Sequence, residues 1–220
     1  MEFADGGDLE GKINNQFKDH GKGFEETFIW TVAFEIFQGL KILHRNNIIH
    51  RDIKSANIFF VDGIAKLGDL NVSKVVENGM CSTQTGTPYY TSPEIWKGKK
   101  YGRKCDIWST GCLIYELCTL HPPFRAKDFP ALYRKVIVGN YDPIPSFYSQ
   151  ELSELIRMCL TVDDDMRPDA SDLLETTILS GMELSLEKFR HEEGSISLIN
   201  PIKCPRVLKF LNNKLPHAKF

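Results

Sequence analysis

The chain has 220 residues and a formal net charge of −2 at pH 7, with 42% hydrophobic and 25% charged residues. This composition is that of an ordinary globular protein of one large or two small domains, and it excludes a largely disordered chain. The near-neutral charge gives no support to wholesale nucleic-acid binding, so we expect no nucleic-acid partner.

The cysteines and the N-terminus bear on the compartment. The six cysteines are scattered, without a Cys-x-x-Cys pair, which favours a reduced protein without structural zinc. The N-terminus is acidic and polar, unlike a signal peptide, and no apolar run is long enough to span a membrane. We therefore expect an intracellular, cytoplasmic protein with no membrane partner.

Two helices are predicted in the first 45 residues. Asp8 can cap a short helix over Leu9 to Phe17. A long amphipathic helix begins near Glu25, where apolar residues start to recur at steps of three and four, and Asn46-Asn47 ends it. The recurring positions are Ile29, Val32, Ala33, Ile36, Leu40 and Leu43.

The stretch His50 to Phe59 reads His-Arg-Asp-Ile-Lys-Ser-Ala-Asn-Ile-Phe and places an acid, a base and an amide in a short loop. Asp52 can accept a proton from a hydroxyl group, Lys54 can neutralise the charge on a moving phosphoryl group, and Asn57 can hold a magnesium ion. The alternative to a catalytic loop is a charged loop that is simply exposed to solvent. The full run with Lys54 and Asn57 in register is much more specific than a lone His-Arg-Asp tripeptide, so we favour phosphoryl transfer.

A β-hairpin follows this loop. Two short apolar runs, Ile58 to Val61 and Ile64 to Leu67, are separated by the turn signal Asp62-Gly63. Asp69 comes directly after the second run, and most such aspartates belong to ordinary turns. Because only one hairpin separates it from Asn57, both side chains can reach one magnesium ion.

The remaining two thirds of the chain predict mainly helices. Val72 to Thr91 shows no periodicity and indicates a long surface loop. Lys104 to Leu120 is apolar nearly all round, which predicts a buried helix whose Asp106 and Glu116 need partners. The other predicted elements are helices at Pro93 to about Lys97, Phe129 to Val138, Glu151 to Leu160, Ala170 to Leu174, Met182 to Phe189 and Arg206 to Leu211, and a turn at Asp163 to Pro168. The fold class is therefore mainly α, with two small strands.

These motifs occur in the order and spacing of the eukaryotic protein kinase catalytic domain, and the chain resembles the C-terminal lobe of that α+β fold. The resemblance divides the chain into a C-lobe from the hinge onward, residues 1–179, and a C-terminal extension, residues 180–220. Within the superfamily the chain looks most like the NIMA-related (Nek) serine/threonine kinases. The matching segments are Met1 to Leu9 (hinge), His50 to Asn57 (catalytic loop), Asp69 to Asn71 (in place of Asp-Phe-Gly), Gly86 to Glu94 (end of the activation segment), Asp106 to Gly111 (central helix) and Arg167-Pro168.

The resemblance implies a catalytic role for three residues and a metal role for two. Asp52 would be the catalytic base, Lys54 would contact the transferred phosphate, and Thr87 would hydrogen-bond both of them. Asn57 and Asp69 would bind Mg²⁺.

Further roles follow from the same resemblance. Glu2 and Ala4 would offer backbone groups to the adenine of ATP, and Phe59 would pack under its ring. Arg51 would pair with a phosphate on the activation loop and order that loop, with Thr83 as the first candidate phosphosite and Ser82 and Thr85 behind it. Structural roles are implied for a buried ion pair between Glu94 and Arg167, and for Asp106, which would accept backbone N–H groups of the catalytic loop.

Two departures concern the Asp-Phe-Gly position. Leu70 keeps an apolar side chain there, and Asn71 replaces glycine, a change that asparagine tolerates better than other side chains. No Gly-x-Gly-x-x-Gly run and no Val-Ala-Ile-Lys-like strand occurs in the sequence. We therefore expect the N-lobe to be absent, and the isolated chain to have little or no activity because its site would stay open to water.

The function expected is that of a serine/threonine protein kinase, which uses ATP and Mg²⁺ to phosphorylate serine or threonine of protein substrates. The alternative is a non-catalytic lobe, a pseudokinase or protein-binding module. An N-terminal lobe or a partner chain is expected to cover the exposed cleft. Cytoskeletal or ciliary association is an expectation by family analogy alone.

Overall fold

The computed structural model describes residues 4–69, 74–75, 88–176 and 179–180. The predicted helices Met182 to Phe189 and Arg206 to Leu211 lie outside these residues, as do Leu70 and Asn71. The boundary between residues 179 and 180 stays a prediction. Among the described residues, no helix combines the length and apolar character needed to cross a bilayer.

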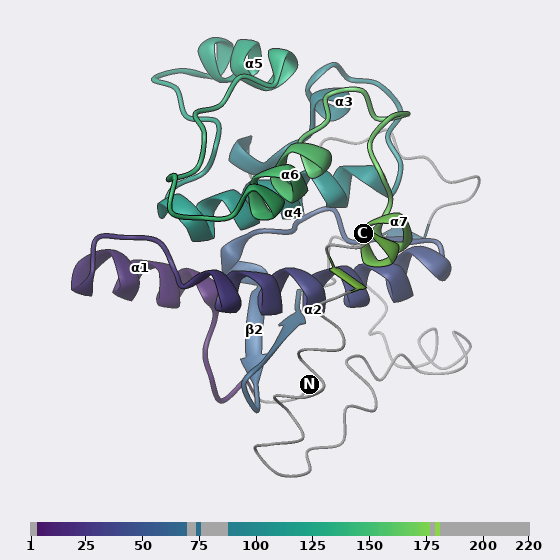
Figure 1. Ribbon diagram of the computed structural model, residues 1–220. Coiled ribbons are helices and arrows are strands. Elements are labelled where there is room, and N and C mark those ends of the chain that lie inside the picture. Colours follow the sequence, from purple (N-terminus) through teal and green to yellow (C-terminus); the bar gives the residue numbers. More distant parts are fainter. Residues whose placement is uncertain (1–3, 70–73, 76–87, 177–178, 181–220) are drawn as a thin grey trace, which may run out of the picture.

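The described residues form a helical body with a small hairpin at one side (Figure 1). This confirms the mainly α fold class with a small β-hairpin. The helices are α1 (Leu9–Asp19), α2 (Glu26–Arg45), α3 (Pro93–Trp96), α4 (Lys104–Thr119), α5 (Phe129–Val138), α6 (Gln150–Cys159) and α7 (Ala170–Glu175). The strands are β1 (Ile48–Ile49), β2 (Ile58–Val61), β3 (Ile64–Leu67) and β4 (Lys74–Val75), with 3-10 turns at Ser55–Asn57 and Pro88–Tyr90.

Helix α4 lies at the centre of the body and packs against both α2 and α6 (Figure 1). Thirteen of its sixteen residues are buried, as the nearly continuous apolar sequence predicts. A Cβ at Gly111 would lie 2.5 Å from the Cβ of Cys159 on α6, so glycine permits the close approach of the two helices. Trp108 stacks on Phe124 at a ring-centroid distance of 5.4 Å.

The hairpin of β2 and β3 has the predicted bounds. Ile58 pairs with Leu67 and Val61 with Ile64. Asp62 and Gly63 both adopt positive φ, at 51° and 76°, as a two-residue hairpin turn of the primed type requires. The hairpin packs on α2 and connects the His50 to Asn57 loop with Asp69.

The prediction of one continuous surface loop from Val72 to Thr91 is wrong at two places. Lys74 and Val75 form β4, which pairs antiparallel with Ile48 and Ile49. Pro88–Tyr90 forms a 3-10 turn that buries Tyr90. A two-residue strand has no period to detect, so its pairing is set by tertiary contacts rather than by local sequence.

Candidate active site

Asp106, in the first turn of α4, fixes the backbone of the loop that carries Asp52. Its Oδ2 accepts the backbone N–H of His50 at 2.9 Å, and its Oδ1 accepts that of Arg51 at 2.9 Å. The Nε2 of His44 lies 2.9 Å from the same Oδ2. Arg51 has a φ of 73°, a conformation that costs a non-glycine residue about 1–2 kcal/mol. The two hydrogen bonds to one carboxylate hold that conformation in place.

The Asp106 carboxylate is 1% exposed, yet it remains ionised. Burial by itself would raise its pKa, but the hydrogen bond and charge of His44 and the hydrogen bond from the Arg51 N–H together hold the pKa below its usual value. The loop is therefore anchored on a fixed buried negative charge.

His50 links the loop to the end of β3. Its ring is fully buried, its Nδ1 accepts the backbone N–H of Asp52 at 3.4 Å, and its Nε2 lies 2.9 Å from the carbonyl oxygen of Gly68. Because Nδ1 accepts, Nε2 carries the hydrogen that the Gly68 carbonyl receives. The imidazole thus holds Asp52 and the residue before Asp69 at a fixed separation.

Asp52, Lys54 and Asn57 form a contact cluster at the surface. The Oδ2 of Asp52 lies 2.9 Å from Lys54 Nζ and 2.9 Å from Asn57 Nδ2. Asn57 Nδ2 also donates to the backbone carbonyl of Asp52 at 2.8 Å. The Asp52 and Lys54 side chains are 13% and 28% exposed. The cluster therefore presents a carboxylate that an external hydroxyl group can reach.

The geometry of Asn57 leaves its amide oxygen on the side away from Asp52. Both partners of the amide nitrogen are acceptors, so the NH₂ end must face Asp52. The backbone carbonyl of Asn57 accepts the N–H of Gly68 at 2.9 Å. This hydrogen bond extends the pairing of the β2–β3 hairpin by one residue pair. Asp69, the next residue, is exposed and has a φ of 51°. The structure thus places Asp69 beside the Asn57 end of the cluster.

These oxygens suit a hard divalent cation. An amide oxygen and a carboxylate are donors that Mg²⁺ accepts, usually together with water and substrate phosphates. In the part of the chain that the structure describes, no group of three or more His, Cys, Asp and Glu side chains could hold a metal ion. Asn57 and Asp69 offer one amide and one carboxylate oxygen, which is fewer ligands than a Mg²⁺ ion takes.

Phe59 and Ala4 lie on the hairpin side of the cluster. The Phe59 ring packs so closely on Gly68 that a Cβ there would lie 2.4 Å from the ring. The segment after Ala4 runs beside β2, since Gly6 N–H donates to the Phe60 carbonyl at 3.1 Å and Gly7 accepts the Phe60 N–H at 2.9 Å. Ala4 and Phe59 are both partly exposed. Glu2 lies outside the described residues.

A second buried cluster connects this loop to α4, and the sequence predicted only part of it. The Tyr90 hydroxyl donates to Glu116 Oε2, Ser55 Oγ lies 3.4 Å from the same hydroxyl, and Ser109 Oγ donates to the Tyr90 carbonyl at 2.9 Å. Burial raises the pKa values of both Tyr90 and Glu116. The sequence showed that Glu116 needs a partner, but nothing local identified Tyr90 or Ser55.

Glu94 and Arg167 form a bidentate ion pair in the interior. Arg167 Nη1 lies 2.9 Å from Glu94 Oε1, and Nη2 lies 3.0 Å from Oε2. The side chains are 3% and 0% exposed. Although burial would raise the pKa of Glu94, the hydrogen bonds and charge of Arg167 hold it below its usual value. The Arg167 guanidinium also lies over the ring of Trp108, 5.1 Å from its centroid. This pair ties α3 to the turn before α7.

Of the three remaining predicted site residues, the structure describes Arg51. The Arg51 guanidinium lies 6.0 Å from the centroid of the Tyr101 ring. Thr83 and Thr87 lie outside the described residues.

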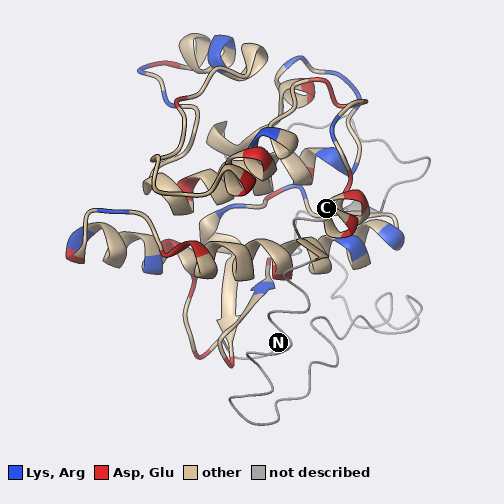
Figure 2. Ribbon diagram, viewed as in Figure 1, with Lys and Arg blue, Asp and Glu red and all other residues tan. Residues whose placement is uncertain are grey.

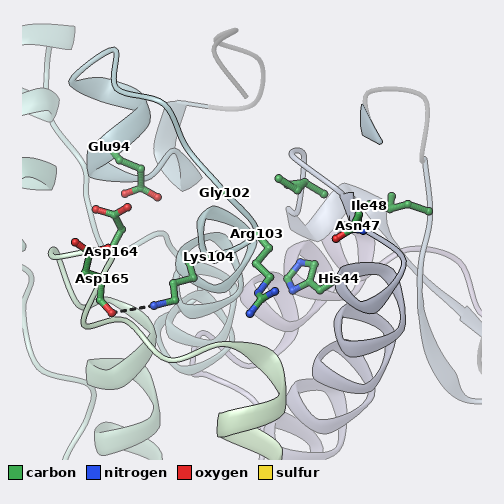
Figure 3. Close-up of a pocket in the computed structure, with 10 residues that line it drawn as sticks. His44, Asn47, Ile48, Glu94, Gly102, Arg103, Lys104, Asp164 and Asp165 are labelled. Atoms are coloured by element: carbon green, nitrogen blue, oxygen red, sulfur yellow. Dashed lines mark hydrogen bonds between the residues drawn. The ribbon is translucent and has the colours of Figure 1, made fainter. Parts of the chain in front are cut away.

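A cavity of about 240 Å³ lies beside His44 and Lys104, and Asp52 does not line it. In Figure 3, Arg103 and His44 line one side of it, and Glu94 and Asp164 lie on the other. Lys104 Nζ donates to the carbonyl oxygen of Asp165 at 2.9 Å. None of Asp52, Lys54, Asn57 or Asp69 lines this cavity, so the candidate chemistry sits on a more open surface.

Comparison with known proteins gives a consistent set of relatives. The family model described as "Protein kinase domain" matches residues 1–179. The chain is 36% identical over 216 residues to the G2-specific protein kinase nimA of Emericella nidulans, covering 85% of this chain and 31% of the relative. It is 40% identical over 202 residues to the serine/threonine-protein kinase Nek5 of Homo sapiens, covering 87% and 28%. It is 41% identical over 177 residues to the serine/threonine-protein kinase Nek3 of Mus musculus, covering 79% and 34%. The chain spans about a third of the length of these relatives.

Proposed function

The chain belongs to the protein kinase family, and from that premise we propose that it acts as a NIMA-related serine/threonine protein kinase. The proposed reaction transfers the terminal phosphoryl group of ATP to the hydroxyl group of serine or threonine in a protein. The observation that carries the proposal is the position of the Asp52 carboxylate, in contact with both Lys54 and Asn57 at 2.9 Å in a loop held by buried Asp106. The human Nek5 and mouse Nek3 relatives are both named serine/threonine-protein kinases, which supports this class.

Asp52 is proposed to act on the hydroxyl group of the substrate. Its carboxylate orients that group by accepting its hydrogen, and takes the proton as the new O–P bond forms and the bond between the terminal phosphorus and the oxygen of the leaving ADP breaks. Asn57 donates to Asp52 Oδ2, which keeps the carboxylate from rotating. The Lys54 ammonium offsets the negative charge that gathers on the transferred group.

A nucleotide site is proposed at the hairpin side of the cluster. Asn57 and Asp69 would hold Mg²⁺, Ala4 and Glu2 would offer backbone groups to adenine, and Phe59 would support its ring. ATP with Mg²⁺ supplies the phosphoryl group and neutralises much of its charge. The hydrogen bond from the Gly68 N–H to the Asn57 backbone carbonyl, which brings the residue before Asp69 next to Asn57, supports this assignment.

Thr87, Arg51 and Thr83 keep their predicted roles as proposals. Thr87 would hydrogen-bond Asp52 and Lys54, and Arg51 would receive a phosphate on Thr83. The use of serine- or threonine-containing protein substrates and the intracellular location are also predictions.

The alternative is a non-catalytic lobe that binds partners. Such a lobe has no chemical reason to keep an ammonium and an amide in contact with one carboxylate. We therefore favour the enzyme.

The test is a phosphoryl-transfer assay with radiolabelled ATP, Mg²⁺ and casein. The chain is assayed alone and behind the N-terminal lobe that the resemblance to kinases calls for, taken from a NIMA-related relative. We expect label on serine and threonine from the fused chain, and a loss of about a hundredfold or more in kcat for Asp52→Asn, since a positioned general base contributes about 10²–10⁴.

The matched control is Asp62→Asn, because this exposed aspartate lies in the hairpin turn, away from the cluster. Its kcat should equal that of the unsubstituted protein. Full activity of Asp52→Asn, or no transfer by a fused chain that binds Mg²⁺ and ATP, would refute the proposal.

A further inference from the structure

The cavity beside His44 is formed by segments that are far apart in the chain. The end of α2, strand β1, helix α3, the start of α4 and the turn before α7 all contribute residues to it (Figure 3). Its volume of about 240 Å³ is below the range of about 300–1,000 Å³ that is usual for drug-sized ligands, so it suits a smaller molecule. Neither Asp52 nor another member of its contact cluster lines this cavity, which is therefore a separate candidate site.

Opposite charges lie on opposite sides of the cavity. Arg103 and His44 line one side, and Glu94 and Asp164 lie on the other (Figure 3). Arg103 also forms an exposed ion pair with Asp169 at 2.8 Å. Because a guanidinium carries several N–H donors in a fixed plane, Arg103 keeps donors for a ligand while it contacts Asp169.

The first turn of α4 adds a backbone donor to the basic side. No side chain caps this helix at Arg103, and no described residue accepts the N–H of Lys104, its first residue. A free helix N-terminus attracts negative groups. The buried Nδ1 of His44 also has no hydrogen-bond partner among the described residues, whereas Nε2 contacts Asp106. In the imidazolium form both nitrogens donate, so Nδ1 can serve a ligand oxygen while Nε2 serves Asp106.

The turn before α7 supplies two carboxylates to the acidic side. Asp164 and Asp165 both line the cavity, and neither side chain forms an ion pair with another described residue. The neighbouring Asp163 does not line the cavity, but its Oδ1 accepts the Asp165 N–H at 3.0 Å and so shapes the turn. Lys104 Nζ donates to the Asp165 carbonyl oxygen at 2.9 Å, which ties the turn to α4.

The charges of the lining side chains balance. The two cations, Arg103 and Lys104, match the two carboxylates of the turn, and Glu94 is already paired with Arg167. Figure 2 shows both blue and red segments at this end of the molecule, near α3. A ligand with a net charge would leave one side of the cavity unmatched, whereas a ligand that carries both charges matches both sides.

We propose that this cavity binds a small zwitterion, with a carboxylate at one end and an ammonium group at the other, such as a free amino acid. The carboxylate lies by Arg103 and the first turn of α4, and the ammonium group lies by Asp164 and Asp165. The short carbon chain between them lies against Ile48 and Ile49. This site shares none of the proposed catalytic residues, so it goes beyond the kinase function and does not depend on it.

The first experiment compares three ligands on the full, unsubstituted chain. They are δ-aminovalerate, which carries both charges, valerate, which keeps only the carboxylate, and pentylamine, which keeps only the ammonium group. Binding is titrated by saturation-transfer difference NMR. We expect saturable binding of δ-aminovalerate in the millimolar range, as for a ligand of few atoms. Valerate and pentylamine should each bind about tenfold more weakly, because each lacks one charge-assisted contact.

Two substitutions assign the ends of the ligand. Asp164→Asn should weaken the binding of δ-aminovalerate and of pentylamine by about tenfold and should not weaken that of valerate. Arg103→Gln should weaken the binding of δ-aminovalerate and of valerate by about tenfold and should not weaken that of pentylamine. The opposite ligand preferences of the two variants distinguish a local contact from a general loss of folding.

Matched controls lie outside the cavity. Asp62 is an exposed carboxylate of the hairpin turn, and Arg157 forms an exposed ion pair with Glu154, as Arg103 does with Asp169. Asp62→Asn and Arg157→Gln should leave all three affinities unchanged. Asp52→Asn should also bind δ-aminovalerate with unchanged affinity, because Asp52 does not line the cavity.

Four results would overturn the proposal. They are the absence of saturable δ-aminovalerate binding, equally tight binding of valerate or of pentylamine, unchanged δ-aminovalerate binding by Asp164→Asn or by Arg103→Gln, and weakened binding by Asp52→Asn, which would place the ligand at the catalytic cluster. The two proposals fail separately. A chain that binds the zwitterion but shows no Asp52-dependent transfer refutes the kinase proposal alone, and active transfer without zwitterion binding refutes this one alone.

Discussion

The two buried carboxylates of α4 show how residue environment decides charge. Asp106 meets three nitrogen donors, His44 Nε2 and the backbone N–H groups of His50 and Arg51. It stays ionised because hydrogen bonds replace the lost water. Glu116 has hydroxyl donors, from Tyr90 and Ser55, and forms no ion pair with a described residue. Its pKa is raised by burial.

Glu116 leads to a pH prediction. Since its pKa is raised in the folded chain, the folded state binds this proton more tightly than the unfolded state. The stability that it contributes is complete below the ordinary value of 4.5 and is lost as pH rises through the raised pKa. Glu116→Gln removes this loss of stability with rising pH, because glutamine does not ionise, and its amide oxygen can still accept the hydrogen bond of the Tyr90 hydroxyl.

The measurement is the thermal midpoint as a function of pH. Glu116→Gln should match the unsubstituted chain below about pH 4.5 and exceed it near neutrality. The control Glu175→Gln, at the exposed end of α7, should follow the unsubstituted chain throughout. A lower midpoint for Glu116→Gln at neutral pH would show that the ionised carboxylate stabilises the fold.

Among the elements, α3 depends on an ion pair with a distant turn. Glu94 lies in α3, and Arg167 comes 73 residues later. Arg167 also donates to the carbonyl oxygens of Thr161 and Lys104, at 2.9 Å and 2.8 Å. One guanidinium therefore joins α3, the start of α4 and the turn before α7.

Arg167→Met should destabilise the chain by about 3–5 kcal/mol, because it leaves the Glu94 carboxylate buried without its cation. The matched control is Arg157→Met, which removes an arginine that is also bidentate to a glutamate but lies on the exposed side of α6. Arg157→Met should lower the free energy of unfolding by about 1 kcal/mol or less. Denaturant unfolding of both variants gives the comparison, and equal losses would contradict the role assigned to burial.

At the scale of the whole molecule, the cluster around Asp52 is built from segments far apart in the chain. His44 comes from the end of α2, Asp106 from α4 and Gly68 from the end of β3. Because α4 packs against α2 and α6, its Asp106 is held rigidly under the loop. The arrangement of helices thereby determines where the Asp52 carboxylate points.

Local sequence was enough to predict the elements with a strong period or turn signal. The β2–β3 bounds follow from two apolar runs around Asp62-Gly63, and α5 has its predicted bounds because Asp128 and Gly139 mark its ends. The kinase resemblance depended on the eight residues from His50 to Asn57, which carry Asp52, Lys54 and Asn57 at the spacing of a catalytic loop. The β1–β4 pair, the Tyr90–Glu116 contact and the contact between Trp96 and Phe129 could not be predicted, because each depends on residues brought together only by tertiary packing.

The most direct test of the account is a double-mutant cycle on kcat for Asp52→Asn and Lys54→Ala, measured in the fused protein. Because the two side chains touch at 2.9 Å, we expect them to act as one unit, so the double variant should lose little more activity than Asp52→Asn alone. If the two losses simply multiplied, Asp52 and Lys54 would act independently, and the proposed catalytic cluster would be contradicted.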